Sequence, residues 1–124
     1  MQNPGMRDHR KLRAFELADQ LVLSVYGATK SFPREEQFGL TSQLRRAVVF
    51  IASNIVEGCA RSSVADYIRF LDMAFGSARE AEYQLTIAAR LGYLTADVAT
   101  ELSQQADETA RVLAGLVRSL RSDS

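Results

Sequence analysis

The sequence has few of the residues from which metal and catalytic sites are commonly built. Its 124 residues include one cysteine, one histidine and no tryptophan. A single cysteine cannot form an intrachain disulfide, and one thiol with one imidazole provides too few ligands for a structural metal site. The di-iron site found in some four-helix bundles needs Glu-x-x-His pairs, and His9 is not part of one. We therefore expect no metal and no cofactor in this protein.

Recognisable catalytic motifs are absent as well. The sequence contains no P-loop, no nucleotide-binding glycine fingerprint and no nucleophile elbow. Cys59 and His9 would be the only candidates for a nucleophilic pair. Cys59 lies in an apolar stretch, however, which favours a buried and inert thiol. We expect the protein not to be an enzyme.

Net charge and long apolar runs are also lacking. The 15 basic and 15 acidic residues give a formal net charge of zero, which is untypical of strongly basic nucleic-acid-binding domains. No charge-free run of apolar residues is long enough to span a membrane, and no basic start is followed by an apolar leader. These absences, together with the lone thiol, predict a cytoplasmic protein with no membrane partner.

The charges that are present are unevenly distributed. Residues 1–62 carry nine basic and six acidic side chains, and residues 63–124 carry six basic and nine acidic ones. Thirteen of the 15 basic residues are arginine, which suits both ion-pair networks and contact with phosphate. Solvated charged faces are common in proteins, so this bias favours ion pairs.

Helical periodicity is the strongest positive signal. Apolar residues recur at three- and four-residue steps in four segments. We expect helices at about residues 11–30, 40–58, 64–91 and 96–121. Short turns between them predict an all-α, up-down-up-down antiparallel four-helix bundle over residues 11–121, preceded by a flexible segment at residues 1–10.

Residues typical of helix caps and helix ends support these boundaries. Ser63 and Thr95 are expected N-caps, and Gly92 is expected to end the third helix. Gly58 is expected to end the second helix in the same way. Gly76 interrupts the third helix among small residues, which suggests that another backbone comes close to it.

The second helix carries two apolar stripes, where a helix with one side in water normally carries one. The first stripe runs from Leu40 to Ile55, and beside it Val49, Ala52, Val56 and Cys59 form the second. A helix of this kind is covered on more than one side, by its own chain and by another copy. We therefore infer a homo-oligomer.

A ribbon of polar residues accompanies the apolar stripes. Arg46 and Asn54 are eight residues apart, and Glu57 and Arg61 follow at steps of three and four, so they share a helix face. One interpretation is that the ribbon pairs with itself and with Glu80 or its neighbour Glu82, which would fix the helix register. The other is a strip that binds phosphate or a partner; the frequency of ion-pair networks favours the structural interpretation. The ribbon comprises Glu36, Gln43, Arg45, Arg46, Asn54, Glu57, Arg61 and Glu80.

A second group of charges stands at the start of the first helix, the unfavourable end of the helix dipole for basic residues. This position suggests that they serve something other than the helix. These charges are Arg7, Arg10, Lys11 and Arg13. Together with Lys30 and Arg34, farther along the chain, they are the candidate nucleic-acid contacts.

The motifs of residues 32–85 resemble the four-helix bundle proteins of the 23S rRNA intervening-sequence family. The likeness covers roughly residues 11–94, and Phe50 departs from it because the family usually has Ser there. The motif residues are Phe32-Pro33, Glu36, Gly39-Leu40, Gln43, Arg45-Arg46-Ala47, Ile51, Asn54-Ile55, Glu57-Gly58, Arg61, Phe70-Leu71, Ala74, Gly76-Ser77, Glu80 and Leu85.

This resemblance implies an all-α bundle that assembles as a ring-like homopentamer, with no enzymatic activity. Family members are encoded within rRNA-gene insertions or elsewhere in bacterial genomes, mostly with no assigned role. The family is also similar to the accessory protein of diversity-generating retroelements, a basic pentamer that binds nucleic acid and a reverse transcriptase.

Three functions follow from these observations. The leading hypothesis is a non-enzymatic homo-oligomeric scaffold of unassigned role that associates with RNA, DNA or a nucleoprotein partner. The alternative is a protein-interaction module that binds no nucleic acid, which the zero net charge favours. A small-molecule-binding or catalytic bundle is the least supported, because no convergent polar site is recognisable in the sequence.

Overall fold

The computed structural model describes residues 7–123, most of which belong to four long helices. These are α1 (Arg13–Thr29), α2 (Leu40–Cys59), α3 (Val64–Arg90) and α4 (Ala96–Ser122). Two 3₁₀ turns, η1 (His9–Lys11) and η2 (Arg34–Glu36), precede α1 and α2. No strand occurs within residues 7–123, so the predicted all-α fold is confirmed for them.

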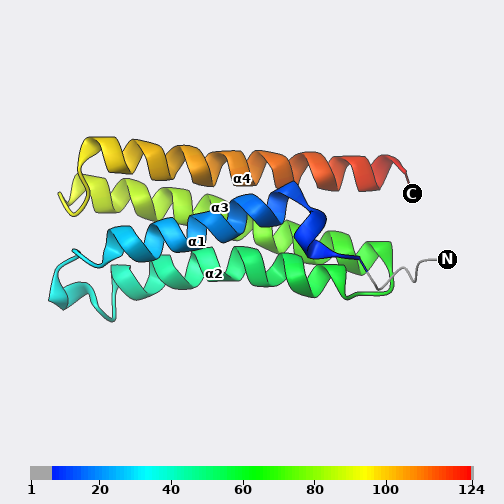
Figure 1. Ribbon diagram of the computed structural model, residues 1–124, viewed down its shortest axis with the longest axis horizontal. Coiled ribbons are helices and arrows are strands. Elements are labelled where there is room, and N and C mark those ends of the chain that lie inside the picture. The colour runs from blue at the N-terminus through cyan, green and yellow to red at the C-terminus, as the bar shows by residue number, and fades with distance from the viewer. Residues whose placement is uncertain (1–6, 124) are drawn as a thin grey trace.

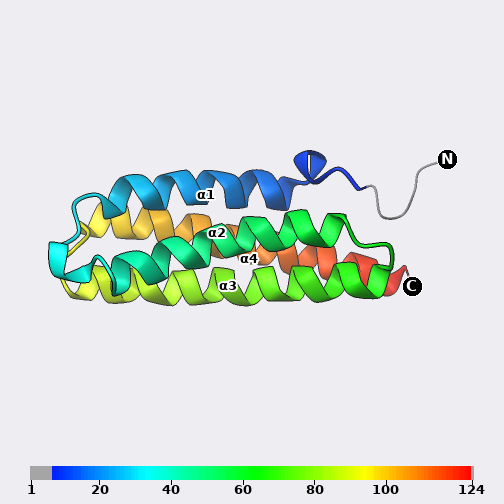
Figure 2. The same cartoon turned by 90° about the horizontal axis from the view of Figure 1, so that it is seen from below.

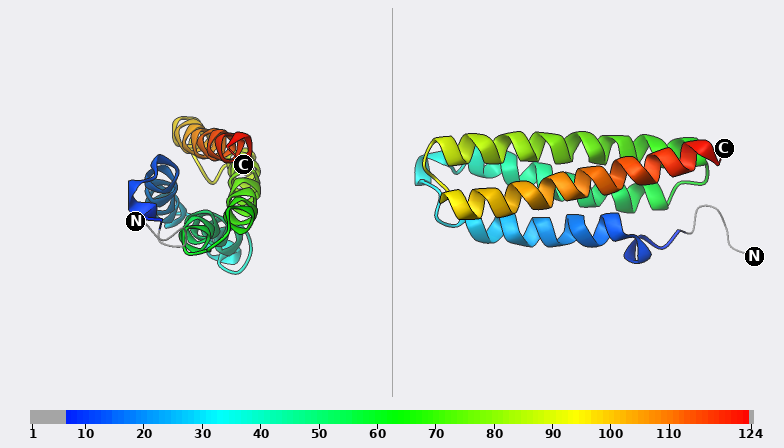
Figure 3. Two further views of the ribbon diagram at one scale, coloured as in Figure 1. Left: turned by 90° about the vertical axis from the view of Figure 1, so that its right-hand side faces the viewer. Right: turned by 90° about the horizontal axis from the view of Figure 1, so that it is seen from above.

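The helices lie side by side along one long axis (Figure 1). The α1–α2 and α3–α4 connections lie at one end, and the α2–α3 turn lies at the other. Each helix contacts two neighbours, α1 packing on both α2 and α4, and α3 packing on both α2 and α4. The view along the axis shows the four helices around a common centre (Figure 3), and Figure 2 shows α1 on the opposite side of the bundle from α3.

The predicted helix caps are present. The Ser63 hydroxyl accepts a hydrogen bond from the Asp66 backbone N–H at 3.1 Å, and the Thr95 hydroxyl accepts one from the Val98 N–H at 3.3 Å. Each bond satisfies an N–H that the first helical turn leaves without a partner. Gly92 follows the end of α3 with a φ of +79°, a backbone conformation that favours glycine. The expectations for all three positions are confirmed.

Gly58 has a different role from the one predicted. It lies inside α2, which ends at Cys59, and so it is not the residue at which the helix stops. A Cβ atom at Gly58 would lie 3.0 Å from the Phe70 Cβ and 3.2 Å from the Tyr67 Cδ1. Glycine is therefore needed because α3 packs closely on α2 at this point.

We expected another backbone to come close to Gly76, and within the described chain this expectation is wrong. This residue is exposed, and a Cβ built on it would meet no atom within 4 Å. The small residues beside it have a separate explanation, because Ala74 and Ala78 are fully buried in the core.

The core follows the first apolar stripe of α2. Leu44, Val48, Ile51 and Ile55 are fully buried and pack with residues from the other three helices. The second stripe is only partly covered, since Val49 remains 38% exposed. One chain therefore buries one side of α2 and leaves part of its second apolar side uncovered.

The two glycines allow a matched test of packing. We expect Gly76→Ala to raise the free energy of unfolding by about 1 kcal/mol, because alanine favours the helix and meets open space. Gly58→Ala should lower it by about 1–3 kcal/mol, because the Phe70 Cβ cannot move without moving α3. Urea denaturation followed by circular dichroism measures both changes. A stable Gly58→Ala variant would contradict the close α2–α3 contact.

Candidate functional site

An apolar groove runs between α1 and α2. Phe15 and Val22 line it from α1, and Val49 and Val56 line it from α2. Val49 and Val56 are 38% and 37% exposed, although both side chains are aliphatic. We call this surface, together with Tyr26 and Phe38 in the hollow that adjoins it at Val49, the α1–α2 seam. Phe38 is 89% exposed, so the seam presents large apolar side chains to solvent.

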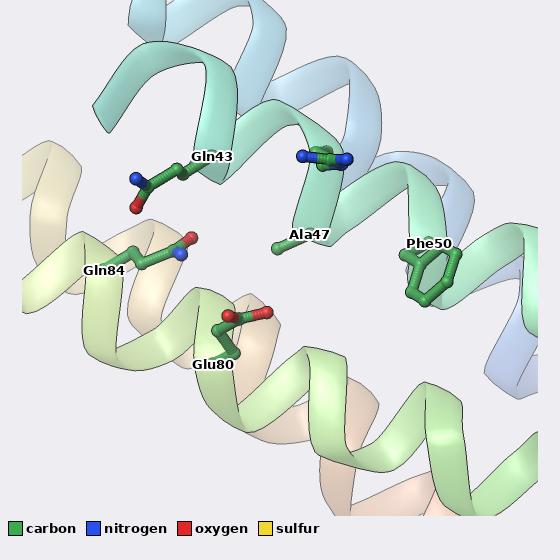
Figure 4. A pocket seen from close by; sticks show the side chains of 6 residues that line it. Gln43, Ala47, Phe50, Glu80 and Gln84 are labelled. Atoms are coloured by element: carbon green, nitrogen blue, oxygen red, sulfur yellow. The ribbon is translucent and has the colours of Figure 1, made fainter. Parts of the chain in front are cut away.

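A second hollow lies on the other side of α2, against α3 (Figure 4). Its volume is about 360 Å³, within the usual size range of ligand sites. We call it the α2–α3 pocket. It is lined by Gln43, Arg46, Ala47 and Phe50 of α2 and by Glu80 and Gln84 of α3.

Three members of the polar ribbon, Gln43, Arg46 and Glu80, line this pocket without forming ion pairs or hydrogen bonds with one another. Arg46 and Glu80 both line it, yet neither forms a hydrogen bond or ion pair within residues 7–123. The expected ion pairs among the ribbon residues are therefore not seen in the described chain. The physical reason is that sharing a helix face brings residues near one another without bringing their charged ends into contact.

Other ribbon members make contacts that hold neighbouring segments together. The Arg45 guanidinium donates to the Thr29 hydroxyl at 2.8 Å and lies 4.6 Å from the Tyr26 ring. One Glu36 carboxylate oxygen accepts from the Leu40 N–H at 3.0 Å, and the other accepts from the Tyr93 hydroxyl at 2.9 Å.

The remaining three ribbon residues are scattered. Arg61 lies 4.6 Å from the Phe70 ring, near the α2–α3 turn. Asn54 is buried, and its amide nitrogen has no hydrogen-bond acceptor in the described part of the chain. Glu57 is exposed and lines the α1–α2 seam. The ribbon residues therefore do not form one surface. Some line the α2–α3 pocket or the α1–α2 seam, and others make separate local contacts.

Near the start of α1, three of the candidate nucleic-acid contacts have partners within the chain. Arg7 donates to the Arg61 carbonyl at 2.9 Å, although residues 1–6 of the segment expected to be flexible lie outside the described residues. Arg10 pairs with Asp8 at 2.9 Å, and Arg13 pairs with Glu108 at 2.6 Å.

The other three candidates are divided between the two ends of α1. Lys11 is exposed beside Arg10, whereas Lys30 and Arg34 lie past the opposite end of the helix. A helix of 17 residues separates the two groups by about 25 Å. The six candidates therefore do not form one surface on a single chain.

Arginines on α3 and α4 form ion pairs, both within α3 and between α3 and α4. Arg79 contacts Glu82 at 2.9 Å and Asp107 at 2.8 Å, and Arg121 contacts Asp72 at 2.9 Å. The hydrogen bond from Arg79 holds the pKa of Asp107 below its usual range. These contacts agree with the ion-pair interpretation of the arginine bias, although exposed pairs of this kind contribute little stability individually.

The single thiol is not part of a catalytic pair. Cys59 is 1% exposed, and burial raises its pKa, so the reactive thiolate is disfavoured. His9 instead packs its ring on Phe15, with 4.7 Å between the ring centroids. Among residues 7–123, no group of three or more His, Cys, Asp or Glu side chains could hold a metal ion.

Comparison with known proteins identifies the family. Residues 10–115 match the family model described as 23S rRNA-intervening sequence protein. The chain belongs to this family. The resemblance predicted from the motifs of residues 32–85 is thereby confirmed.

One protein of solved structure has the same fold as this chain. It is a protein of unknown function from the S23 ribosomal protein family of Bacteroides thetaiotaomicron, with a TM-score of 0.78 and 23% sequence identity. The similarity covers 84% of this chain and 97% of that chain. No curated protein matches the chain. In addition, none of the helices in residues 7–123 combines the length and apolar character needed to cross a membrane.

Gln84 is the pocket residue that the sequence analysis missed. It is only 8% exposed, although its side chain is an amide. It lies four residues after Glu80 on α3, and that spacing alone would have placed both side chains on one helix face.

The buried thiol and phenol make stability sensitive to alkaline pH. Burial raises the pKa of Cys59 above its ordinary value of 9.0 and that of Tyr67 above 10.0. The folded chain therefore keeps both protons to a higher pH than the unfolded chain does. Their contribution to stability is complete below pH 9 and falls as the pH rises, by up to about 1.4 kcal/mol per pH unit for each group.

Urea denaturation at a series of pH values from about 7 to 10.5 tests this expectation. The double variant Cys59→Ala, Tyr67→Phe has neither titrating group and should lose less stability over that range than the unchanged chain. Equal losses in the two proteins would show that these groups do not titrate with unfolding.

Proposed function

We propose that this protein is a non-enzymatic scaffold whose up-down-up-down bundles assemble into a ring-like homo-oligomer in the cytoplasm. The observation that supports this proposal is the exposed α1–α2 seam. Removing apolar area from water contributes about 25 cal/mol per Å², and a second copy of the chain would cover side chains that one copy leaves exposed. The family name describes where such proteins are encoded and assigns no reaction.

A matched pair of valines tests the assembly surface. Val49 lies on the seam and Val98 lies on α4, and their exposures are nearly equal at 38% and 37%. We expect Val49→Glu to convert the oligomer into monomers, because a buried unpaired carboxylate is costly at an interface. Val98→Glu should leave the oligomer intact.

Molar mass from light scattering during size-exclusion chromatography measures the outcome. An unchanged chain that is already monomeric would overturn the proposal of self-assembly. A Val98→Glu variant that dissociates as readily as Val49→Glu would move the interface away from the seam.

Association with nucleic acid is a second candidate function. It is favoured by the arrangement of Arg7, Arg10, Lys11 and Arg13 within seven positions just before and at the start of α1. Arg10 retains 77% exposure of its side chain despite its pair with Asp8. Several copies in a ring would place several such groups side by side, which strengthens weak phosphate contacts.

The basic residues before and after α1 allow a matched test of nucleic-acid binding. We expect Arg10→Glu with Lys11→Glu to weaken binding of labelled RNA or DNA in fluorescence anisotropy and to reduce the slope of log affinity against log salt by about 2. Lys30→Glu with Arg34→Glu, at the other end, serves as the control and should change neither quantity. Flat anisotropy of the unchanged protein at low salt would leave a protein-interaction module as the function of the scaffold.

A further inference from the structure

We propose that the α2–α3 pocket binds a small zwitterion, specifically a free α-amino acid with an apolar or aromatic side chain. This activity goes beyond the scaffold function, and the pocket shares Arg46 and Phe50 with the hollow that adjoins the α1–α2 seam. The pocket has a volume of about 360 Å³, enough for a ligand of this size.

The pocket leaves two side chains of opposite charge without partners in the described chain. Arg46 and Glu80 both line it, and neither has an ion pair or hydrogen bond within residues 7–123. A ligand with one charge would satisfy one of these groups and repel the other. An amino acid carries a carboxylate for the Arg46 guanidinium, which binds such groups in a bidentate manner, and an ammonium group for Glu80.

The pocket also contains the buried amide of Gln84. This side chain lines the pocket at 8% exposure, and its Oε1 has no hydrogen-bond donor in the part of the chain that is described. An acceptor left in this state carries a desolvation cost that a donor from a ligand would relieve. An ammonium group has three N–H donors and can serve both Glu80 and Gln84. The last torsion of glutamine is soft, so the amide can turn its oxygen toward the ligand.

The shape of the pocket determines where the rest of the ligand lies. Figure 4 shows Gln43 and Gln84 directed toward each other from α2 and α3 at one end, with Glu80 directed toward α2 beside them. Phe50 lies at the other end, 53% exposed, with its ring directed toward α3. The small side chain of Ala47 lies between these ends. The ammonium end therefore lies by the two amides, and the side chain extends over Ala47 to the Phe50 ring.

The charge balance distinguishes an amino acid from a nucleotide. A nucleoside monophosphate would offer Arg46 a phosphate and could stack on Phe50. Its charge of nearly −2 would however lie close to the Glu80 carboxylate and would provide no cation for it. The pocket has one positive and one negative side chain, which matches a ligand of zero net charge.

Isothermal titration of the intact protein with L-phenylalanine tests the proposal, and we expect saturable binding in about the millimolar range or tighter. Phenethylamine lacks the carboxylate and N-acetyl-L-phenylalanine lacks the ammonium group. Each should bind about tenfold more weakly or worse, because each loses a hydrogen bond to a charged group. Adenosine monophosphate should not compete.

Variants then assign the binding to the pocket. Arg46→Gln and Glu80→Gln should each weaken L-phenylalanine binding by about tenfold or more. Arg90→Gln on α3 and Glu101→Gln on α4 remove exposed charges outside the pocket and should bind as the unchanged protein does. Light scattering on the same samples checks that the variants keep the oligomeric state.

Four results would overturn the proposal. They are the absence of saturable binding, full binding by the Arg46→Gln and Glu80→Gln variants, equal binding of phenethylamine or N-acetyl-L-phenylalanine, and competition by adenosine monophosphate. Because Arg46 and Glu80 are exposed and form no hydrogen bond or ion pair within residues 7–123, the two substitutions should leave the fold intact.

Discussion

The close contact of α2 with α3 at Gly58 is the constraint on which the arrangement of this protein most depends. Without a side chain at Gly58, Tyr67 and Phe70 can approach the α2 backbone directly, and their approach fixes how the two helices meet after the α2–α3 turn. Further along the same two helices the residues that face one another include Gln43 and Gln84, and there a hollow of about 360 Å³ remains. A single helix pair is therefore tightly packed at one end and open at the other, and residue size explains the difference.

The arginines of this family member fall into two populations that composition alone could not separate. Arg13, Arg79 and Arg121 each pair with an acidic residue on a neighbouring helix, so their charges are balanced within the chain. Arg46, by contrast, forms no ion pair with Glu80, the carboxylate that lines the same pocket from α3. Part of the positive charge is thus balanced by ion pairs within the chain, while one unpaired charge of each sign remains in the α2–α3 pocket.

Local features were the ones that the sequence allowed us to predict. The four helices, the caps at Ser63 and Thr95 and the turn at Gly92 depend on residues within a few positions of one another. The pairing of the ribbon could not be predicted in this way, because it depends on how each helix is rotated about its own axis. The same limit explains Gly76, where a small residue in a helix indicates close packing only if another element lies opposite. Gln84 was missed because a buried amide within an apolar helix resembles a surface residue in the sequence.

The hydrogen bond between Glu36 and Tyr93 connects the two turns at one end of the bundle. Glu36 also holds the first N–H of α2, and Tyr93 packs its ring against Phe32 with 5.5 Å between centroids. Opening either turn therefore requires the other to lose a partner, so the two behave as one cooperative unit in local unfolding. At the opposite end, the Arg7 guanidinium donates to the Arg61 carbonyl and joins the segment before α1 to the α2–α3 turn. That bond is exposed and is made by a side chain outside the helices, so fluctuations that expose backbone amides should be larger there than at the end that Glu36 holds closed.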